Sequence, residues 1–310
     1  MNVKSTPRKQ LPDVDYEKYQ TSFHGNRSNW WSRPLDSIAG RHGLDLSSPE
    51  RSTSGRNVVL LAGDWVVKLV PPFWGRMWER ECVALQHVHG RLSARTPVFQ
   101  AAGSIGSWSY LVMERIDGIS LGWRGELGSP TDRLELGVQQ GRLAREISRL
   151  PAVEALRWDW SGVLEEDRRD MVAGLADTSP PLSASAEDYV AEAGDLSSGN
   201  TLLHGDLASI NLLKGDRGDL ALIDWSDASV GPADHEFISP FMHQFRGDPQ
   251  GLEGFWTGFG DVEDPTSLRH RIMARSIVKY ATLMAGYLDD LPGSVPVSWP
   301  EAAERFTLIP

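Results

Sequence analysis

The stretch that decides the fold runs from residue 204 to residue 225 and reads HGDLASINLLKGDRGDLALIDW. It places Asp206 in a tight His-Gly-Asp turn, followed by two short apolar runs that the turn-forming residues 214–218 separate. These runs predict a small hairpin that begins at Asn211 and ends at Asp224. The open end of such a hairpin brings an amide oxygen and a carboxylate together, and Mg²⁺ is bound by oxygen ligands of this kind. The stretch therefore predicts a magnesium site beside Asp206.

Nearer the N-terminus, a second hairpin and a helix supply two further charged groups. Residues 57–70 read NVVLLAGDWVVKLV, in which two apolar runs flank a Gly-Asp turn and Lys68 lies near the end of the second strand. Residues 77–89 have apolar side chains at helical spacing, and Glu81 falls on the same inward face. A carboxylate on a buried face requires a partner. That partner is either Lys68 or, if the helix lies near a surface, a neighbouring arginine.

The remaining patterns predict a strand-rich part followed by a helix-rich part. Residues 1 to about 28 are polar and expected to be loosely ordered, and a glycine-containing loop after residue 116 is the natural joint. The other predicted elements are helices at 35–43, 132–150 (with Thr131 as N-cap), 159–176, 187–193 and 277–288, a strand at 109–116, and a Ser/Pro-rich loop at 177–185. The predicted domains are an N-terminal extension of uncertain order (1–50), an N-lobe (51–116) and a C-lobe (117–310).

The bulk properties limit the class of partner. The 310 residues include 42 acidic and 31 basic side chains, a formal net charge of −11, so the surface would repel nucleic-acid phosphates and attract a cationic substrate. The single cysteine, Cys82, lies among apolar residues and is expected to be a buried packing thiol in a reducing, cytoplasmic setting. Residues 1–12 lack the apolar core of a signal peptide, and every apolar run is too short to span a bilayer. We expect neither a nucleic-acid nor a membrane partner.

Five of these residues together match the requirements of phosphoryl transfer. The reaction needs a cation on the donor phosphates, metal ligands, and a carboxylate that orients the attacking hydroxyl. Each residue alone is weak evidence, because a solvated lysine or an aspartate that caps a helix is common. The complete set, in this order along the chain, predicts transfer of a nucleotide γ-phosphoryl group to a hydroxyl. The set is Lys68, Glu81, Asp206, Asn211 and Asp224.

The order VxK, a glutamate on the next helix, HGDxxxxN and IDW resembles the aminoglycoside phosphotransferase family, within the wider protein-kinase-like fold. The segment IDWSDA at residues 223–228, followed by Gly231 and Glu236, is most similar to the hygromycin-type branch. The resemblance extends from about residue 52 to about residue 241. It implies an α+β, bilobal fold, with a small β-rich N-lobe that contains one key helix and a larger, mainly helical C-lobe.

The resemblance also implies a role for each residue of the set. Lys68 would contact the α- and β-phosphates of ATP or GTP, with Glu81 as its ion-pair partner. Asp206 would orient the acceptor hydroxyl, and Asn211 and Asp224 would hold Mg²⁺. The strand at 109–113 and the link that follows would bind the base through backbone groups, and the loop over the phosphates lacks the GxGxxG pattern of protein kinases. Besides Lys68, the implied nucleotide-binding residues are Ser54, Gly55, Met113, Glu114 and Ile116.

The acceptor is expected between the catalytic loop and the C-terminal helices. The candidates are Asp227, Trp160 and Glu236, although Glu236 also resembles the acidic residue that braces the catalytic loop in this family. Carboxylates there would suit the amino or guanidino groups of an aminoglycoside or a basic peptide antibiotic. His204 belongs to the catalytic stretch and could act as a base, but a structural role in the turn is preferred.

The chain has 12 tryptophans. Two pairs of them, Trp30-Trp31 and Trp158/Trp160, could wall a ligand pocket, but core packing or a surface staple is favoured for each tryptophan taken singly. Two other functions stay open. The chain could be a metabolite kinase of the same fold that acts on choline, a sugar or an amino alcohol, or a nucleotide-binding pseudokinase module. The resemblance allows a monomer or a homodimer.

Overall fold

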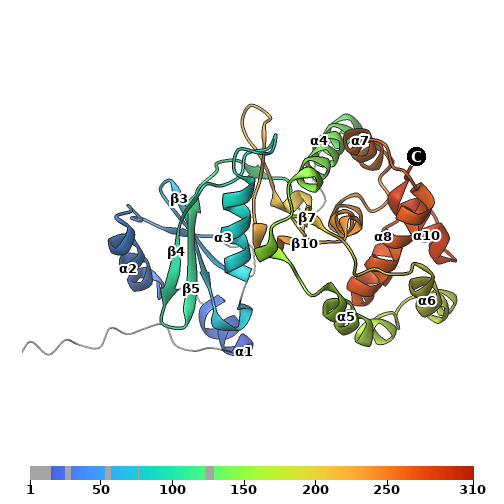
Figure 1. Ribbon diagram of the computed structural model, residues 1–310, viewed down its shortest axis with the longest axis horizontal. Helices are drawn as coiled ribbons and strands as arrows, with labels where there is room; N and C mark the ends of the chain where they lie inside the picture. The colour runs from blue at the N-terminus through green and yellow to red at the C-terminus, as the bar shows by residue number, and fades with distance from the viewer. Residues whose placement is uncertain (1–14, 25–28, 53–56, 76, 123–128) are drawn as a thin grey trace, which may run out of the picture. The chain divides into compact units, whose positions relative to one another are not determined.

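The chain divides into two compact units. The computed structural model describes residues 15–24, 29–52, 57–75, 77–122 and 129–310. The first unit comprises Met1–His89 and Thr96–Asp117, and the second comprises Gly90–Arg95 and Gly118–Pro310. The first is built on a β-sheet and the second is mainly helical (Figure 1).

The first unit contains a five-stranded antiparallel sheet with the strand order β1-β2-β3-β5-β4. The hairpin predicted at residues 57–70 is confirmed: Val58 pairs with Leu69, and Gly63 makes the turn with a φ of 56°. Strand β4 is not predicted from the sequence, because its residues FQAAGSI are mostly small or polar and lack a clear apolar alternation. The strands are β1 (Glu50–Arg51), β2 (Val58–Ala62), β3 (Trp65–Val70), β4 (Phe99–Ile105) and β5 (Trp108–Glu114).

Helices cover both faces of this sheet (Figure 1). On one face an aromatic core forms around Trp108, whose ring centroid lies 5.8 Å from that of Tyr19 and 5.5 Å from that of Trp30. Tyr19 and Trp31 are buried, so the expectation of loose order is wrong for the described residues before position 25, and the core interpretation of Trp30 and Trp31 is confirmed. The segments on this unit are α1 (Tyr16–Tyr19), the π-helical η1 (Gln20–His24), α2 (Ser32–His42), η2 (Pro72–Trp74) and α3 (Met77–Val88).

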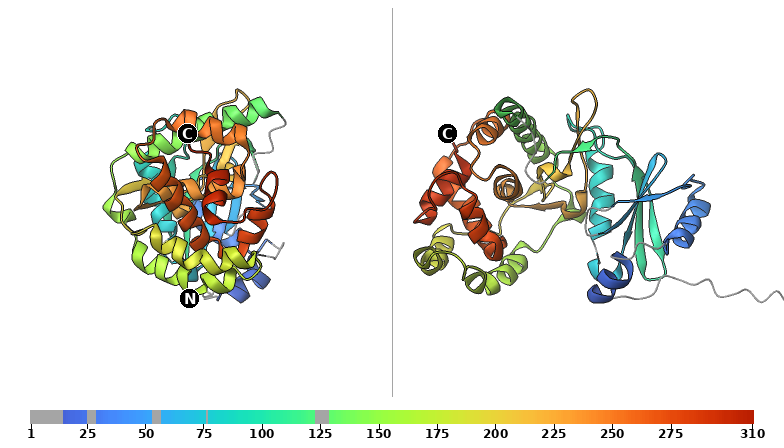
Figure 2. Two further views of the ribbon diagram at one scale, coloured as in Figure 1. Left: turned by 90° about the vertical axis from the view of Figure 1, so that its right-hand side faces the viewer. Right: turned by 180° about the vertical axis from the view of Figure 1, so that it is seen from behind.

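The second unit joins helices to two small antiparallel sheets, β10-β7 and β6-β8-β9 (Figure 2). The strands are β6 (Ile119–Ser120), β7 (Thr201–Leu203), β8 (Leu212–Lys214), β9 (Leu220–Leu222) and β10 (Ser229–Gly231). The α-helices are α4 (Pro130–Arg149), α5 (Trp160–Gly174), α6 (Pro180–Glu192), α7 (Pro249–Phe259), α8 (Pro265–Lys279), α9 (Met284–Asp289) and α10 (Trp299–Thr307). Shorter helical segments are η3 (Glu154–Leu156), η4 (Ser209–Asn211), η5 (Trp225–Asp227), η6 (Ala233–Phe237), the π-helical η7 (Pro240–Phe245) and η8 (Ala281–Leu283).

The N-terminal ends of two helices differ from the prediction. The N-cap of α4 is Ser129 rather than Thr131, because Ser129 and Asp132 bind each other's backbone N–H groups in a capping box. Helix α6 begins at Pro180, inside the segment predicted as a loop. Prolines fit the first turn of a helix, where their missing N–H would have no intrahelical partner.

The long helix predicted through residues 277–288 is interrupted. Helix α8 ends at Lys279, and the turn η8 separates it from α9. Tyr280 leaves the helical conformation, with φ −121° and ψ 27°, and its ring packs edge-on against His243 at 4.7 Å. The chain is therefore not one continuous helix through these residues.

Helices α4 and α7 lie side by side and are in backbone contact (Figures 1 and 2). Gly137 and Gly141 of α4 face Gly254 and Gly258 of α7 at the closest points of this interface. A Cβ atom on Gly141 would lie 1.9 Å from the Phe255 carbonyl oxygen, and one on Gly258 would lie 2.0 Å from a carbonyl oxygen of α4. Backbones approach this closely only where side chains are absent, so these glycines fix the spacing of the two helices.

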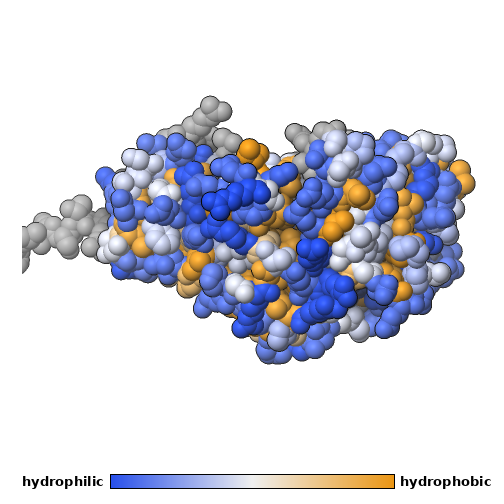
Figure 3. Space-filling view, turned by 90° about the horizontal axis from the view of Figure 1, so that it is seen from above, coloured by the Kyte–Doolittle hydropathy of each residue, from blue (hydrophilic) through white to orange (hydrophobic). Residues whose placement is uncertain are grey.

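On the face shown in Figure 3 hydrophilic residues predominate, and the coloured hydrophobic residues form small groups. Among the described residues, no helix is long and apolar enough to cross a membrane. Cys82 is buried in α3, and burial raises the pKa of its thiol to about 12, which fits the predicted packing role.

The close approach of α4 and α7 makes a prediction about stability. Gly141→Ala should lower the free energy of unfolding by about 2–3 kcal/mol, because the obstructing atom is backbone and cannot rotate away. The matched control is Gly40→Ala in α2, where an added Cβ meets nothing within 4 Å. Alanine there should stabilise by about 0.5–1 kcal/mol through its higher helix propensity. Urea denaturation measures both, and equal responses would contradict the close-packing explanation.

Candidate active site

The turn His204-Gly205-Asp206 is fixed from behind by a buried carboxylate. Glu236 of η6 accepts the backbone N–H of His204 on one oxygen (3.2 Å) and that of Gly205 on the other (3.1 Å). Glu236 is 4% exposed, and burial raises its pKa to about 7. Gly205 has a φ of 85°, and a Cβ there would lie 2.4 Å from the Asp227 carbonyl oxygen. Only glycine fits this position, which explains the middle residue of the motif.

His204 connects this turn to the strand that leads to Asp224. Its Nδ1 accepts the Asp206 N–H (3.3 Å), and its Nε2 donates to the Ile223 carbonyl (3.0 Å). Its ring lies edge-on to Trp225, with centroids 4.6 Å apart. The side chain is fully buried, and burial lowers its pKa, which keeps the ring neutral. Because both ring nitrogens are bonded inside the protein, the geometry favours a positioning role for His204 over that of a base.

Asn211 orients Asp206. Its Nδ2 donates to both the Asp206 carbonyl oxygen (2.8 Å) and the Asp206 carboxylate Oδ2 (3.0 Å). The short helix η4 forms the last part of the five-residue spacing between Asp206 and Asn211, and it turns Asn211 back toward Asp206. Since the amide nitrogen of Asn211 is bonded to Asp206, the amide oxygen points away from Asp206.

The hairpin predicted between Asn211 and Asp224 is present. Strands β8 and β9 are antiparallel, and the Ile223 N–H donates to the Asn211 carbonyl (3.0 Å), so pairing continues to the residue before Asp224. Asp224 itself has a φ of 61°, in the left-handed region that aspartate tolerates better than most residues. Ser226 Oγ donates to its Oδ1 (2.9 Å). A non-glycine residue held in this conformation at a cluster of polar groups is typical of a functional site.

The oxygen atoms at the end of this hairpin fit a magnesium ion. Asn211 offers an amide oxygen and Asp224 a carboxylate, both hard ligands. Magnesium usually takes one or two carboxylates or similar groups from protein and completes its shell with water and phosphate oxygens. The donor set is therefore of the chemical type that a nucleotide-bound Mg²⁺ requires.

In the first unit, Lys68 and Glu81 form a buried ion pair. The distance from Lys68 Nζ to Glu81 Oε1 is 2.6 Å, and the residues are 7% and 2% exposed. Strand alternation places Val67 and Leu69 in the aromatic core, so Lys68 points to the opposite face of the sheet, which α3 covers. Burying either charge alone would be costly, and the pairing offsets that cost. The structure thus brings together the two residues that the sequence pairs.

The segment expected to bind the base begins inside the sheet. Met113 is buried in β5, and the N–H groups of Glu114 and Arg115 donate to carbonyls of the first unit at 2.9 and 2.8 Å. Those two N–H groups are therefore already used, and Ile116 follows after the strand has ended. Ser54 and Gly55, expected in the loop over the phosphates, lie outside the described residues.

The structure separates the three acceptor candidates. Trp160 is buried, donates from Nε1 to a carbonyl of β10 (2.9 Å) and packs on His235 with ring centroids 4.5 Å apart. Burial raises the pKa of Asp227, while the ammonium of Lys279 acts in the opposite direction. Glu236 uses both oxygens on the turn described above, which favours the bracing role over contact with an acceptor.

A buried pair of glutamines, which the sequence does not predict, lies behind the same loop. Gln140 of α4 donates from Nε2 to the carbonyl of Leu207, the residue after Asp206. Gln140 and Gln244 of η7 also exchange two amide hydrogen bonds, at 2.9 and 2.8 Å. Gln140 is 0% exposed and lies on the apolar face of α4. A polar residue on an apolar face is the signal that could have revealed it.

A second overlooked group holds η6 in place. Asp234, two residues before Glu236, forms ion pairs with Arg271 Nε and Arg275 Nε of α8, both at 2.9 Å. Asp234 and Arg275 are 4% and 1% exposed. These contacts attach the segment that carries Glu236 to a long helix.

The chain belongs to the phosphotransferase enzyme family, whose model matches residues 46–271. The predicted enzyme class is confirmed: the protein is a phosphotransferase of the class that acts on an alcohol group. A comparison with curated proteins finds no match.

Solved structures show the same fold. The GDP and kanamycin complex of APH(2")-IIia is 18% identical, with a TM-score of 0.63 over 82% of this chain and 91% of that chain. The ADP and spectinomycin complex of spectinomycin phosphotransferase APH(9)-Ia is 15% identical, with a TM-score of 0.62 over 87% and 96%. The apoenzyme of macrolide 2'-phosphotransferase MphH from Brachybacterium faecium is 18% identical, with a TM-score of 0.60 over 91% and 99%. At these identities the likeness shows the fold, which confirms the predicted protein-kinase-like α+β class.

The brace at Glu236 makes a prediction about pH. Burial raises its pKa above the ordinary carboxyl value, so the unfolded chain ionises first and the native state loses stability as the pH rises from about 4.5 to about 7. Glu236→Gln cannot ionise and should lack this loss. It should also destabilise by about 1–3 kcal/mol, because its NH₂ group opposes a backbone N–H. Urea denaturation across pH tests both, with the exposed Glu304→Gln as control. Identical pH profiles for wild type and Glu236→Gln would refute the assignment.

The glutamine pair makes a prediction about turnover. Gln140→Leu should destabilise by about 1–3 kcal/mol, because it leaves buried polar groups without partners. Adding Gln244→Leu should recover much of that stability, since both amides of the pair are then replaced by apolar groups. In both variants the Leu207 carbonyl lacks its hydrogen-bond donor, so kcat should be lower than in wild type while nucleotide affinity is kept. The second substitution should not restore kcat. Gln139→Leu on the same helix is the control, and recovery of kcat together with stability would show that the pair only packs.

Proposed function

We propose that this phosphotransferase moves the γ-phosphoryl group of ATP or GTP to a hydroxyl group of an antibiotic. The observation that carries the proposal is the set of contacts at Asp206: the turn is braced by Glu236 and the carboxylate is oriented by Asn211. A carboxylate held in this way is arranged to accept a hydrogen bond from an attacking hydroxyl. The functional group required at each position of the set is present, which argues against a pseudokinase.

Each residue of the proposed machinery has a separate role. Lys68, kept charged and in place by Glu81, neutralises the donor phosphates. Asp206 orients the acceptor hydroxyl and accepts its proton as the oxygen attacks phosphorus. Asn211 and Asp224 would hold Mg²⁺, which supplies charge neutralisation on the phosphate oxygens.

The donor and acceptor classes are supported by the structural neighbours. Solved relatives of the same fold hold GDP, ADP or ATP, and several hold an antibiotic. We propose that the base is bound through backbone groups of the segment from Met113 to Ile116, excluding the two N–H groups already used within the sheet. The structural neighbours include an enzyme bound to the polycation kanamycin and a macrolide phosphotransferase, so they leave the chemical class of the acceptor open.

The roles of Asp206 and Asp224 can be separated by experiment. Asp206→Ala should reduce phosphoryl transfer by about three orders of magnitude or more, while nucleotide binding measured by calorimetry largely survives. Asp224→Ala should instead weaken nucleotide binding in the presence of Mg²⁺ and leave the metal-free affinity unchanged. Asp216→Ala, in the exposed turn between β8 and β9, is the control. Retained transfer by Asp206→Ala, or unchanged magnesium dependence for Asp224→Ala, would exclude that residue from its role.

A further inference from the structure

A lysine lies beside the residues predicted to bind the acceptor. Lys279 is the last residue of α8, and its Nζ lies 3.2 Å from His235 Nε2 and 5.5 Å from the centre of the Tyr280 ring. The His235 ring in turn packs on Trp160, with centroids 4.5 Å apart. As a whole residue Lys279 is exposed, while its ammonium group lies against His235 and Tyr280.

The surroundings of Lys279 are acidic. Its ammonium interacts electrostatically with the carboxylates of Asp227, Asp206 and Asp167, which come from three different segments of the second unit. Burial of the ammonium group works to lower the pKa of Lys279, but Tyr280 and these carboxylates outweigh it and leave the pKa above its ordinary value. The group therefore stays fully charged at neutral pH, where the sequence suggested only negative charge.

We propose that Lys279 and His235, with His235 supported by the buried Trp160, form an acceptor subsite that binds an oxygen-rich, uncharged or weakly cationic part of the acceptor and disfavours a polycation. The inference rests on the proposed function, because it is Asp206 that draws the acceptor hydroxyl to this place. One ammonium N–H is taken by His235, which leaves donor capacity for hydroxyl or carbonyl oxygens of a ligand. The partly exposed ring of Tyr280 offers apolar surface next to it, and the buried Trp160 supports the ring of His235 from behind.

The size of the charge effect follows from Coulomb's law. Lys279 interacts electrostatically with the carboxylate of Asp206. When the hydroxyl of an acceptor reaches Asp206, the neighbouring atoms of that acceptor therefore also lie within range of the Lys279 charge. At a partly exposed site, two like charges some 6 Å apart change binding by about tenfold. Lys279 thus offsets one of the carboxylates that would otherwise attract aminoglycoside amines. The expected acceptor is therefore no longer a polycation but a molecule with little positive charge, such as a macrolide or a nucleoside.

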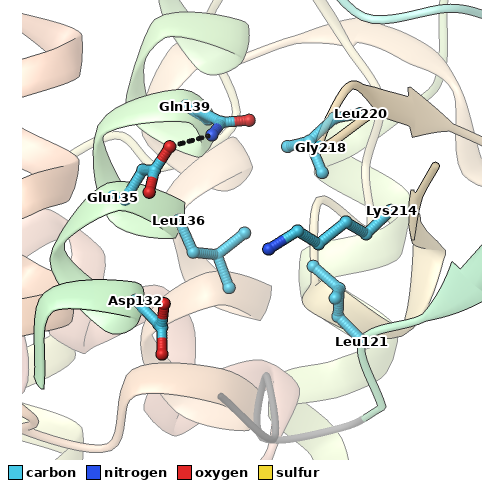
Figure 4. Close-up of a pocket in the computed structure, with 8 residues that line it drawn as sticks. All are labelled: Leu121, Asp132, Glu135, Leu136, Gln139, Lys214, Gly218 and Leu220. Carbon is cyan, nitrogen blue, oxygen red and sulfur yellow. Dashed lines mark hydrogen bonds between the residues drawn. The ribbon is translucent and has the colours of Figure 1, made fainter. Parts of the chain in front are cut away.

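The test compares acceptors of graded charge on matched variants. The acceptors are kanamycin as the polycation, a macrolide with a single amine, and an uncharged nucleoside antibiotic. Lys279→Gln removes the charge and Lys279→Arg retains it. Lys214→Gln is the control, because Lys214 is also exposed but points between Leu121 and Leu136, in a pocket formed by α4 and the β8–β9 hairpin (Figure 4). Thermal unfolding verifies that all variants fold.

The expected result is an inversion of preference. Wild type, Lys279→Arg and Lys214→Gln should prefer the macrolide or nucleoside by kcat/KM. Lys279→Gln should lose about tenfold on that acceptor and gain about tenfold on kanamycin. A change of the same sign on all acceptors, or a wild-type preference for kanamycin that Lys279→Gln leaves intact, overturns the proposal.

Calorimetric binding of each acceptor, in the presence of a non-hydrolysable nucleotide, separates this inference from the proposed function. Binding that inverts between wild type and Lys279→Gln without any transfer would refute antibiotic phosphorylation and support the subsite. Transfer without inversion would support phosphorylation and overturn the role of Lys279. Failure of every acceptor to bind would overturn the subsite as well.

Discussion

Two hydrogen bonds from the backbone of His204 and Gly205 to the carboxylate of Glu236 are the contact on which the active site depends. A loop at the end of a short strand has little local structure to define it, and its N–H groups would otherwise have to find water or adopt several conformations. Because the carboxylate of Glu236 is buried, these hydrogen bonds are strong, and losing them would cost more free energy than at an exposed site. The loop that presents Asp206 is consequently determined by a residue 32 positions later in the chain.

The brace is itself held by longer-range contacts. Asp234 attaches η6 to α8 through Arg271 and Arg275, so the position of Glu236 follows that of a 15-residue helix. From the other side, Gln140 holds the carbonyl that follows Asp206, and the glycine contacts between α4 and α7 fix the helix on which Gln140 lies. The loop is therefore placed by two rigid supports, while local hydrogen bonds from His204 and Asn211 complete its shape. This arrangement preorganises a charged group without requiring the ligand to order it.

Much of the site could be predicted from the sequence, since its groups are linked by short spacings or by the simple geometry of strands and helices. Lys68 and Glu81 are 13 residues apart, on a strand and on the helix that follows it. Asp206 and Asn211 are five residues apart in one loop. Glu81 is predictable because it is a carboxylate on the apolar face of a helix. The same test would have found Gln140, which lies four residues after Leu136 and three before Leu143 on the buried face of α4. The acceptor side was predicted less well, because Lys279 is at a helix end, where a lysine is ordinary.

The sequence by itself determined the catalytic motif, the hairpin that ends at Asp224, the paired Lys68 and Glu81 and the α+β class. These depend on periodicity, turn chemistry and spacing, which are local properties of a chain. Only the tertiary structure decided that Glu236 braces the loop, that Tyr19 and Trp31 belong to a core, and that Lys279 stands among the carboxylates. Such contacts join segments far apart in the chain, and their energies come from burial and from charges in a shared low-dielectric environment. Neither burial nor proximity of that kind exists until the chain has folded.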